Sequence, residues 1–447
     1  MKCVILAAGK GSRLHTIKYN KPSIPILGVP LIERTIYSAM EAGADDFYVV
    51  TGYREELIRT ILKQLFDRDG IRITPIFNEN WRKENGISLL RAKEYLHEPF
   101  LLLMADHLFD PAIVRKLIEF NLNDTDMVLA VDRNIHNNPN INFEDVTKVL
   151  TNNGKIVDIG KDLTDFNGFD TGIFLCNPSI FSVLEGSKKQ FKDSRLSKGM
   201  QILANEGRAN AIDINGNFWI DVDDQQSFKR AERLLLNNLG NKQNDGPISH
   251  YLNRPLSVAI SRKLVNYSIT PNQISFFTFF TSVVASVVFM FAGYPALLAG
   301  GILAQFASII DGCDGEIARL KHLTNIYGAW LDSVLDRYAD AFLLFGLTWH
   351  IYLEKMDILI LPLGFFALIG SFMVSYTAVK YDSLPNKQKS SFTKFRIGRD
   401  VRIFLIFLGA LFNQAFAALL IIAVVMNAET LRRLIIRRNL KQIGNLV

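Results

Sequence analysis

The sequence has few cysteines, and none has the spacing that a disulfide framework or a zinc site needs. Its three cysteines, Cys3, Cys176 and Cys313, lie far apart in a chain of 447 residues, and none belongs to a Cys-x-x-Cys pair. Such a set favours free thiols. No signal-peptide pattern precedes the first apolar run, because Lys2 leads directly into Cys3–Leu6. We therefore expect the first half of the chain to stay in the cytosol, where nucleotides and Mg²⁺ are available.

Basic clusters are absent from the first half, and the net charge of +6 is modest. The two clusters that are present, at Lys380–Arg402 and Arg432–Lys441, both adjoin apolar runs. A nucleic-acid-binding protein would carry its basic residues on a soluble surface, away from such runs. Positive charge beside apolar helices is instead typical of the cytosolic side of a membrane protein.

Long uncharged runs are absent before about residue 241 and frequent after residue 271. Ile274–Ala292 is uncharged for 19 residues and Ile358–Val379 for 22. A helix of either length can cross a hydrocarbon core of about 30 Å. We therefore expect a cytosolic domain over residues 1–235, a linker with a juxtamembrane segment over 236–270, and a transmembrane domain over 271–447.

The remaining apolar stretches bring the expected count to six spans. Ala296–Ile310 is short, but it gains length if its helix continues into Asp311, and Tyr327–Leu353 carries several acidic residues. Ile403–Ala428 is too long for one span, and Asn413-Gln414 is its only polar break. We therefore expect an all-α domain of six transmembrane helices, with two of them in this last stretch.

Charge supports an even number of spans in a multi-pass protein of the cell membrane. Six spans place the Arg432–Lys441 cluster on the same cytosolic side as the first domain, whereas five would place it outside. Before the first span, Pro255–Tyr267 mixes apolar positions with Arg262 and Lys263. This pattern is typical of an amphipathic segment that lies on the membrane surface.

The first half alternates short apolar runs with helical patterns, which predicts a Rossmann-like α/β fold with a mainly parallel sheet. Ligands of such sheets bind at the carboxyl ends of the strands. The expected strands are Lys2–Ala7, Asp46–Thr51, Ile71–Phe77, Phe100–Met104 and Met127–Asp132, and the expected helices are Leu31–Ala42, Glu55–Phe66 and Pro111–Asn121.

A glycine-rich turn follows the first strand and suggests a phosphate site. Gly9 and Gly11 let the backbone turn closely around an anion, so that its N–H groups can bind phosphate. Arg13 adds a planar fork of donors and Lys21 a compact positive charge. The expected nucleotide-binding residues here are Leu6, Ala7, Gly9, Gly11, Ser12, Arg13 and Lys21.

The string Leu6–Leu14, with its continuation Lys21–Pro30, resembles the signature of sugar-phosphate and alcohol-phosphate nucleotidyltransferases. The resemblance covers roughly residues 1 to 230. It implies that Lys21 and Arg13 are catalytic and that two carboxylates hold a catalytic Mg²⁺. These map to Asp106 and to Asp223, with Asp221 as the competitor for the second role.

Two further stretches have weaker resemblance to this family. The segment that contains Asn85 and Ser88 resembles the base-recognition stretch of the cytidylyl branch, although a plain helix start explains it about as well. Lys148 and the segment around Asp170 resemble walls of the acceptor-phosphate pocket. The resemblance therefore implies that Asn85 and Ser88 bind nucleotide and that Lys148 and Asp170 bind the acceptor.

Four aspartates form the strongest pattern in the chain. Asp311 and Asp314 are three residues apart, and Asp332 and Asp336 are four apart, so on helices each pair shares one face. Four carboxylates on neighbouring membrane helices would repel one another unless cations lay between them. The pattern therefore indicates divalent cations, Mg²⁺ by preference, that grip a diphosphate; solvated carboxylates at helix ends are the alternative.

The full string is Asp-x-x-Asp-Gly-x-x-Ala-Arg, eight residues, then Gly-x-x-x-Asp-x-x-x-Asp, and it matches the signature of CDP-alcohol phosphotransferases. The resemblance implies two metal ions on the four aspartates and makes Asp336 the general base, although Asp332 and Asp336 could exchange roles. The expected nucleotide-binding residues of this site are Gly315, Ala318, Arg319 and Gly328. Small residues at three of these positions also suit helix packing.

Three arginines at helical spacing, Arg396, Arg399 and Arg402, precede an apolar span. They are candidates for binding a phosphate on the acceptor. An explanation at least as simple is that they are topology-setting charges.

The two halves together resemble the bifunctional inositol-1-phosphate cytidylyltransferase/di-myo-inositol phosphate phosphate synthase family. This implies CTP, inositol 1-phosphate and CDP-inositol as ligands, and by analogy a homodimer among membrane lipids. Transfer of another phosphoalcohol to a lipid hydroxyl is the nearest alternative. An inactive membrane scaffold or transporter is the alternative from a different class.

Overall fold

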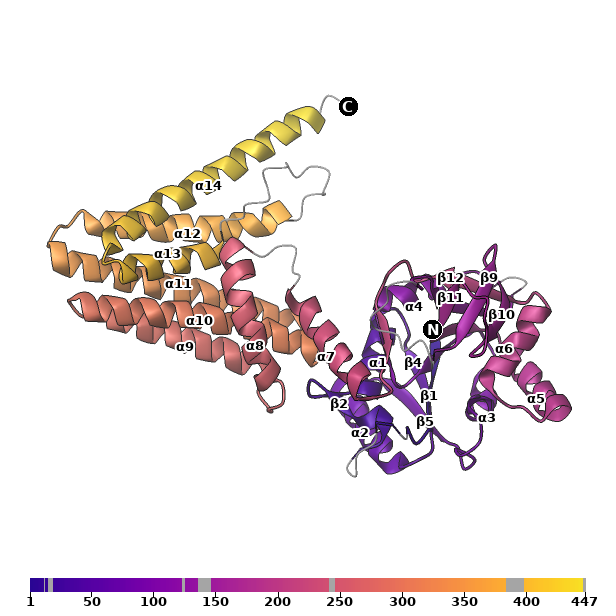
Figure 1. The fold of residues 1–447 in the computed structure, drawn as a ribbon. Coiled ribbons are helices and arrows are strands. Elements are labelled where there is room, and N and C mark those ends of the chain that lie inside the picture. Colours follow the sequence, from indigo (N-terminus) through magenta and orange to yellow (C-terminus); the bar gives the residue numbers. More distant parts are fainter. Residues whose placement is uncertain are drawn as a thin grey trace. The chain divides into compact units, whose positions relative to one another are not determined.

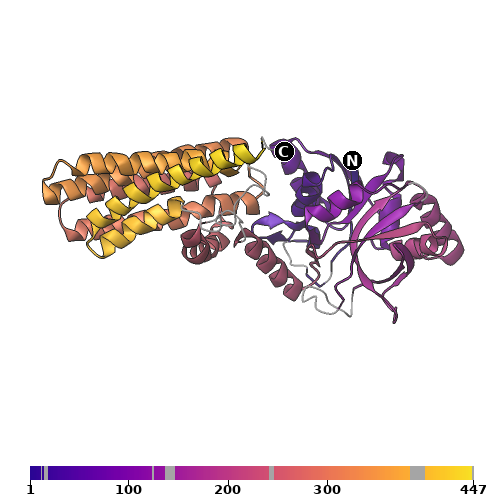
Figure 2. The same ribbon diagram turned by 90° about the horizontal axis from the view of Figure 1, so that it is seen from above.

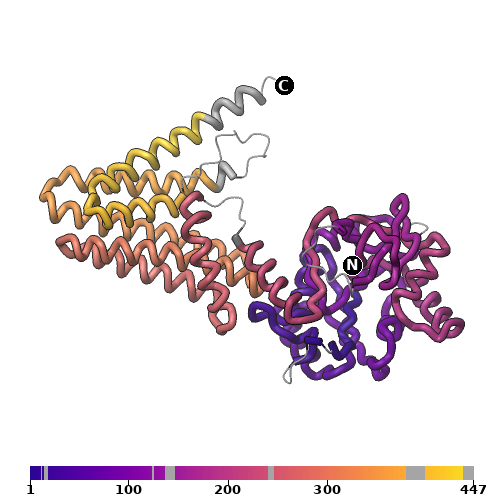
Figure 3. Tube along the Cα trace, in the orientation of Figure 1, coloured from indigo at the N-terminus to yellow at the C-terminus, as the bar shows by residue number. Residues whose placement is uncertain are grey.

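The computed structural model describes residues 1–11, 13–14, 19–122, 125–135, 146–240, 246–382 and 398–444 (Figure 3). Ser12 and Arg396, expected to bind nucleotide and acceptor, lie outside the described residues. The chain forms two compact units, unit 1 over Met1–Leu234 and unit 2 over Leu235–Val447.

Unit 1 is built on a nine-stranded sheet with the order β5-β4-β1-β6-β11-β8-β12-β10-β9. The half from β5 to β6 is parallel throughout, as the sequence predicts. In the other half β11 and β10 run antiparallel to their neighbours, so this part of the sheet is mixed. The strands are β1 (Lys2–Ala7), β4 (Asp46–Thr51), β5 (Arg72–Phe77), β6 (Phe100–Met104), β8 (Met127–Asp132), β9 (Lys148–Asn152), β10 (Lys155–Gly160), β11 (Gly168–Cys176) and β12 (Ala209–Asp213).

Helices cover both faces of this sheet, as Figure 1 shows. Side chains alternate along β1, so Cys3 and Ile5 pack under α1, α2 and α4, whereas Val4 faces the core beneath α3, α5 and α6. Burial on both faces explains why the strands read as continuous apolar runs. The helices are α1 (Leu31–Glu41), α2 (Glu55–Asp69), α3 (Asn85–Leu90), α4 (Pro111–Ile118), α5 (Ile180–Phe191), α6 (Leu196–Asn205) and α7 (Gln225–Gly240), with single turns at η1 (Lys21–Ser23) and η2 (Lys93–Tyr95).

Two small ribbons lie outside the main sheet. β2 (Pro25–Ile26) pairs with β3 (Val29–Pro30). β7 (His107–Phe109) pairs antiparallel with β13 (Trp219–Asp221), and His107 stands opposite Asp221. The β7–β13 ribbon brings the late acidic segment beside the carboxyl end of β6, where the sequence predicts the first site.

Unit 2 is helical, and its long helices run side by side in both views (Figures 1 and 2). Within the described residues, four helices are long and apolar enough to cross a membrane, over Pro271–Phe289, Tyr294–Leu320, Ile360–Ala378 and Ala415–Ile435. The helices are α8 (Arg254–Leu264), α9 (Pro271–Phe289), α10 (Tyr294–Leu320), α11 (Ile326–Lys355), α12 (Ile360–Asp382), α13 (Arg399–Leu411) and α14 (Ala415–Gly444), and a π-helical turn η3 (Ser249–Asn253) precedes α8.

The expected helices of unit 2 appear with shifted ends. α10 continues through Asp311 to Leu320, so its aspartates lie on the same helix as its apolar run. The last apolar stretch breaks into α13 and α14 at 412–414, where Asn413 has a φ of 54°. This break lies at the predicted polar pair.

The juxtamembrane helix α8 packs against α10 through polar contacts. Arg254 Nη1 lies 2.7 Å from Glu316 Oε1, and Ser257 Oγ donates to the same oxygen at 2.6 Å. Glu316 is fully buried, with 0% exposure. One face of the predicted amphipathic segment therefore packs against α10.

Candidate active sites

Lys21 is the centre of the first site. Its side chain is 7% exposed, and its ammonium donates to Asp106 Oδ2 at 2.5 Å and to Asp221 Oδ1 at 3.3 Å, and also contacts Asp223. Burial lowers the pKa of Lys21, but the three carboxylates outweigh this and hold the pKa well above its usual range. Lys21 is therefore a fixed cation among three acids.

Strand pairing explains why these acids meet. Asp106 follows β6 at the start of the turn into β7, and the backbone N–H of Val222 donates to the Asp106 carbonyl at 3.1 Å. The β7–β13 ribbon then places Asp221 and Asp223 next to Asp106. Both members of the predicted late acidic pair lie at the site, so the structure leaves Asp221 and Asp223 as competitors for the same role.

His107 also belongs to this cluster, although the sequence analysis did not predict it as a site residue. Its Nδ1 lies 2.7 Å from the Thr171 carbonyl oxygen, and its Nε2 lies 3.7 Å from Asp106 Oδ1 and 3.6 Å from Asp221 Oδ1. Burial lowers the pKa of His107, but Asp221 and Asp106 raise it to a net value of about 9. Asp106, His107 and Asp221 offer ligand atoms within 4.8 Å of one another, which is compact enough for a metal ion.

The glycine-rich turn opens onto this cluster through a cavity of about 300 Å³. Gly11, at a φ of 62°, lies directly against the Lys21 side chain, so any larger residue there would collide with it. Arg13 Nη2 lies 2.9 Å from Asp223 Oδ2. Six of the residues predicted to bind nucleotide line this one cavity: Leu6, Ala7, Gly9, Gly11, Arg13 and Lys21.

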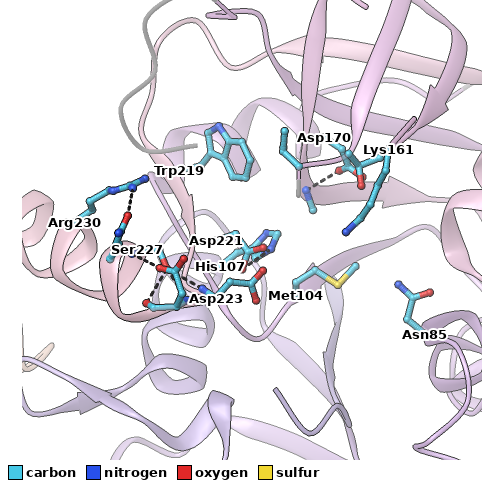
Figure 4. Close-up of a pocket in the computed structure, with 15 residues that line it drawn as sticks. Asn85, Met104, His107, Lys161, Asp170, Trp219, Asp221, Asp223, Ser227 and Arg230 are labelled. Atoms are coloured by element: carbon cyan, nitrogen blue, oxygen red, sulfur yellow. Dashed lines mark hydrogen bonds and ion pairs between the residues drawn. The ribbon is translucent and has the colours of Figure 1, made fainter. Parts of the chain in front are cut away.

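A second cavity of about 340 Å³ adjoins the acids on the other side (Figure 4). Asn85 and Asp170, both predicted, line it. Burial raises the pKa of Asp170 to about 6. The sequence did not indicate Lys161, Trp219 and Arg230, which also line it. A lone lysine, tryptophan and arginine carry no spacing signal, so only the fold identifies them.

Two predicted residues lie away from these cavities. Ser88 is buried inside α3, and its hydroxyl accepts a hydrogen bond from Asn78 Nδ2 at 3.0 Å. Lys148 places its ammonium 5.2 Å from the centre of the Phe166 ring. Neither lines the cavities around the acids described above.

In unit 2, the predicted aspartates converge from α10 and α11. Asp311, Asp332 and Asp336 present carboxylate oxygens within 4.8 Å of one another. Asp314 accepts a hydrogen bond from Ser275 Oγ at 2.6 Å and contacts the Gly315 backbone N–H. A set of carboxylate oxygens is the donor set that Mg²⁺ prefers, so both acidic centres fit a hard divalent cation.

A cavity of about 250 Å³ lies beside these aspartates. It is lined by Asp314 and Asp332 together with all four residues predicted to bind nucleotide: Gly315, Ala318, Arg319 and Gly328. Asn272 and Ser275 of α9 complete its wall and were not predicted. The small residues therefore face a cavity instead of only filling a helix interface.

Arg399 and Arg402 lie inside unit 2, against the aspartates. Arg399 Nη1 is 2.7 Å from Asp311 Oδ2 and 2.6 Å from Asp336 Oδ1. Arg402 Nη2 is 2.6 Å from Asp340 Oδ2, and both of these side chains are 3% exposed. Charges that serve only to set topology would lie in a loop, so this burial favours a role in the site for both arginines.

Comparison with known families identifies the same two domain types that the two acidic centres suggest. Residues 3–152 match the model of the MobA-like NTP transferase domain, and residues 268–429 match that of CDP-alcohol phosphatidyltransferase. The chain is thus a nucleotidyltransferase joined to a CDP-alcohol phosphotransferase, and it is an enzyme with membrane helices.

Full-length relatives narrow this class. A "Bifunctional IPC transferase and DIPP synthase" of Aquifex aeolicus is 35% identical over 436 residues, 96% of this chain and 96% of the relative. One of the same description from Rubrobacter xylanophilus is 34% identical, over 96% of this chain and 95% of the relative. An "Archaetidylinositol phosphate synthase" of Pyrococcus horikoshii is 33% identical over 168 residues, 37% of this chain and 81% of the relative. The chain belongs to the family of bifunctional IPC transferases and DIPP synthases.

Proposed function

We propose that the chain catalyses two consecutive reactions. Unit 1 joins CTP to inositol 1-phosphate and releases pyrophosphate, which gives CDP-inositol. Unit 2 transfers inositol phosphate from CDP-inositol to a second inositol 1-phosphate, which gives di-myo-inositol phosphate phosphate and CMP. One observation carries the proposal: a single chain contains two acidic centres. The first belongs to a nucleotidyltransferase domain, which would make a CDP-alcohol, and the second to a CDP-alcohol phosphotransferase domain, which would consume it.

In unit 1, a phosphate oxygen of inositol 1-phosphate attacks the α-phosphorus of CTP. The turn at Gly9–Gly11 and Arg13 bind the triphosphate, and Lys21 offsets the charge that grows on the leaving pyrophosphate. Lys161 and Arg230 line the adjoining cavity, in which inositol 1-phosphate would bind. When bound, a divalent cation held by Asp106 with Asp221 or Asp223 supplies further neutralisation of the phosphates.

In unit 2, the acceptor hydroxyl gives its proton to Asp336 as its oxygen attacks the phosphorus next to inositol in CDP-inositol. The bond to the bridging oxygen breaks and CMP leaves. The cavity lined by Gly315, Ala318 and Gly328 receives the cytidine part, and Arg319 contacts phosphate. Two Mg²⁺ on Asp311, Asp314, Asp332 and Asp336 would clamp the diphosphate.

We further propose six spans, α9 to α14, with the nucleotidyltransferase domain and the C-terminus in the cytosol and with domains at 1–235 and 271–447. α11 has 30 residues and is long enough to cross, but Asp332, Asp336, Arg337 and Asp340 make it less apolar than the four helices named above. Exposed phenylalanines on α9, such as Phe280, offer a face for lipid or for a second copy in a homodimer. Reporter fusions after residue 356 and after residue 444 would test the orientation.

A lipid acceptor is the second candidate for unit 2. The relative from Pyrococcus horikoshii favours it, because its name describes a lipid product and it matches 37% of this chain. Extraction of the product into organic solvent would support the lipid acceptor, and retention in water supports inositol 1-phosphate.

The decisive experiment incubates the purified chain with CTP, Mg²⁺ and inositol 1-phosphate and follows phosphorus NMR. The proposal expects a diphosphate signal that appears first and a phosphodiester signal that replaces it. Adding CDP-inositol directly bypasses unit 1 and tests unit 2 alone. A diphosphate that accumulates without any phosphodiester, in water or in solvent, would contradict the two-step proposal.

A further inference from the structure

A third carboxylate follows the aspartate pattern on α11. Asp332, Asp336 and Asp340 are spaced four residues apart, so they occupy successive turns of one helix face. With 3.6 residues in a turn, this spacing drifts around the helix. Asp332 and Asp336 meet Asp311 of α10, whereas Asp340 meets α13. Asp340 lies outside the eight-residue-spaced pattern, so the pattern gives it no role.

Asp340 holds two arginines with its two oxygens. Its Oδ1 accepts from Arg399 Nε at 3.2 Å, and its Oδ2 accepts from Arg402 Nη2 at 2.6 Å. Arg337 lies further away, with Nη1 at 3.6 Å from Oδ2. Arg399 and Arg402 are three residues apart on α13, so a single carboxylate fixes two consecutive guanidinium groups on one helix face.

The Nη1 atoms of the two guanidinium groups are not bonded to Asp340. Arg399 Nη1 reaches Asp311 and Asp336, at the position of the proposed general base. Arg402 Nη1 is buried and has no hydrogen-bond partner within the described part of the chain. A buried N–H group without a partner is costly, so its presence indicates a ligand that completes it.

A second carboxylate of unit 2 offers a contrast. Glu429 of α14 also accepts from two arginines, Arg432 and Arg433. There Arg433 Nη1 donates to the Val374 carbonyl at 2.7 Å, so this donor joins α14 to α12. The ion pairs of Glu429 thus serve helix packing. By contrast, Arg399 Nη1 faces the aspartates of the site and Arg402 Nη1 has no partner in the described part of the chain. Buried ion pairs add little net stability compared with apolar packing, so packing alone is a weak reason for the Asp340 cluster.

We propose that Asp340 is a positioning residue that orients Arg399 and Arg402 to bind the phosphate of a phosphorylated acceptor next to Asp336. This inference rests on the proposed function of unit 2. The two guanidinium groups supply the positive charge that a phosphate dianion requires, and Arg402 Nη1 is the open donor that a phosphate oxygen would accept from. Holding the phosphate there places the acceptor's hydroxyls near the general base.

The test replaces Asp340 by Asn in the full chain, with CDP-inositol supplied and inositol 1-phosphate varied. Loss of the anchoring charge is expected to raise KM for inositol 1-phosphate about 10- to 100-fold, the range of a lost charge-assisted hydrogen bond. KM for CDP-inositol is expected to change less than about twofold, because its site on Gly315 and Arg319 is intact. Inorganic phosphate, as a competitive inhibitor against the acceptor, is expected to weaken by the same factor as KM rises.

Glu429→Gln is the matched control, because it removes another carboxylate that is less than a tenth exposed from an arginine pair of the same unit. It is expected to leave both KM values and the phosphate inhibition unchanged. Arg402→Lys is the second variant, which keeps the positive charge but lacks the planar guanidinium group. It replaces Asp340→Asn in the test if that variant fails to fold. It too is expected to raise KM for the acceptor alone.

Equal effects on both substrates, or no effect in either variant, would overturn the inference, because a purely structural role predicts no preference for the acceptor. Failure of the proposed function looks different. A wild-type chain that forms no phosphodiester removes the function and this inference together. An active chain with an unaltered acceptor KM in Asp340→Asn and Arg402→Lys removes the inference alone.

Discussion

Both acidic centres must offset the repulsion among clustered carboxylates, and they do so on different scaffolds. In unit 1, Asp106, Asp221 and Asp223 surround Lys21, and strand pairing brings together residues up to 202 positions apart. In unit 2, Asp311 and Asp336 surround Arg399, and the aspartates come from two consecutive helices. Each centre thus has its own built-in cation beside the carboxylates.

The difference teaches where chemical information lies in a sequence. Residues three or four apart lie on the same face of a helix, so a site built on helices appears in the sequence as a short motif. The centre in unit 2 could therefore be predicted from its motif. A site at strand ends is dispersed along the chain, and only the topology assembles it. The local cations differ as well, because an ammonium is a point charge and a guanidinium is a fork.

The largest expected effect separates the two centres. Asp336→Asn removes the proposed base of unit 2 and should slow phosphodiester formation by about 10²–10⁴-fold, the usual contribution of general base catalysis. CDP-inositol should accumulate, because unit 1 is untouched, and phosphorus NMR would show this. Continued phosphodiester formation at the normal rate would give the base role to another residue, with Asp332 the first to examine.

The reciprocal change is expected to be somewhat smaller. Asp106→Asn should lower CDP-inositol formation by about 10²–10³-fold, as for other losses of electrostatic stabilisation at a reaction centre. Transfer from supplied CDP-inositol should continue at the wild-type rate. If both activities fell together, the two centres would not be independent and the comparison would fail.

Exchanging the local cations sharpens the comparison further. Lys21→Arg is expected to lower unit 1 activity about 10- to 100-fold, because a planar guanidinium cannot reproduce the contacts of a single ammonium with Asp106, Asp221 and Asp223. Arg399→Lys is expected to lower unit 2 activity by a similar factor, since a lysine has no second nitrogen to replace the Nε donor to Asp340 while its ammonium faces Asp311 and Asp336. Activity of each half-reaction measures this, and tolerance of either exchange would show that charge alone suffices there.

The smallest expected effect is a change in stability with pH. The half-buried Asp170 has its pKa raised to about 6, so the folded state disfavours its charged form. That penalty is absent below about pH 4, grows as the pH rises to about 6, and is complete above it. Asp170→Asn should therefore raise the free energy of unfolding of unit 1 by about 1–3 kcal/mol at pH 8.

Hydrogen exchange of the β11 amides at pH 8 and pH 4, with rates corrected for intrinsic exchange, would measure this gain. The same variant should weaken binding of inositol 1-phosphate if Asp170 faces it in the cavity. A gain of equal size at both pH values would show that the charge of Asp170 is not its cause.

Much of the fold follows from local patterns. β1, β4, β6 and β8 begin and end at the predicted residues, because buried strands are bounded by abrupt changes in polarity. Asn413 marks the break between α13 and α14 as predicted. The antiparallel β11 was not predicted, since a buried run of apolar residues carries no sign of its direction.

The sites divide in the same way. Asp311, Asp332 and Asp336 meet as their spacing predicts, and Gly315 and Gly328 line the adjoining cavity. His107, the first residue of β7 and the residue after the predicted Asp106, was not predicted from the sequence, because only the pairing of β7 with β13 places it opposite Asp221. Lys161, Arg230 and Asp340 lie outside the motifs that the sequence offers, and their positions at the two sites follow only from tertiary packing.

The buried pair of Arg254 and Glu316 also determines where the chain can be divided. The sequence predicts a linker and a juxtamembrane segment over 236–270, yet within this range the Ser249 N–H donates to Asp400 at 2.9 Å and Arg254 forms an ion pair with Glu316 of α10. Cutting after residue 270 would remove Arg254, which is the ion-pair partner of Glu316. The Glu316 carboxylate, close in sequence to Asp314 and Arg319, would then be left without its partner among the apolar residues of α10. A separately expressed membrane half should therefore begin before Gly246, and one that begins at Pro271 should be poorly folded however well its hydrophobic helices insert.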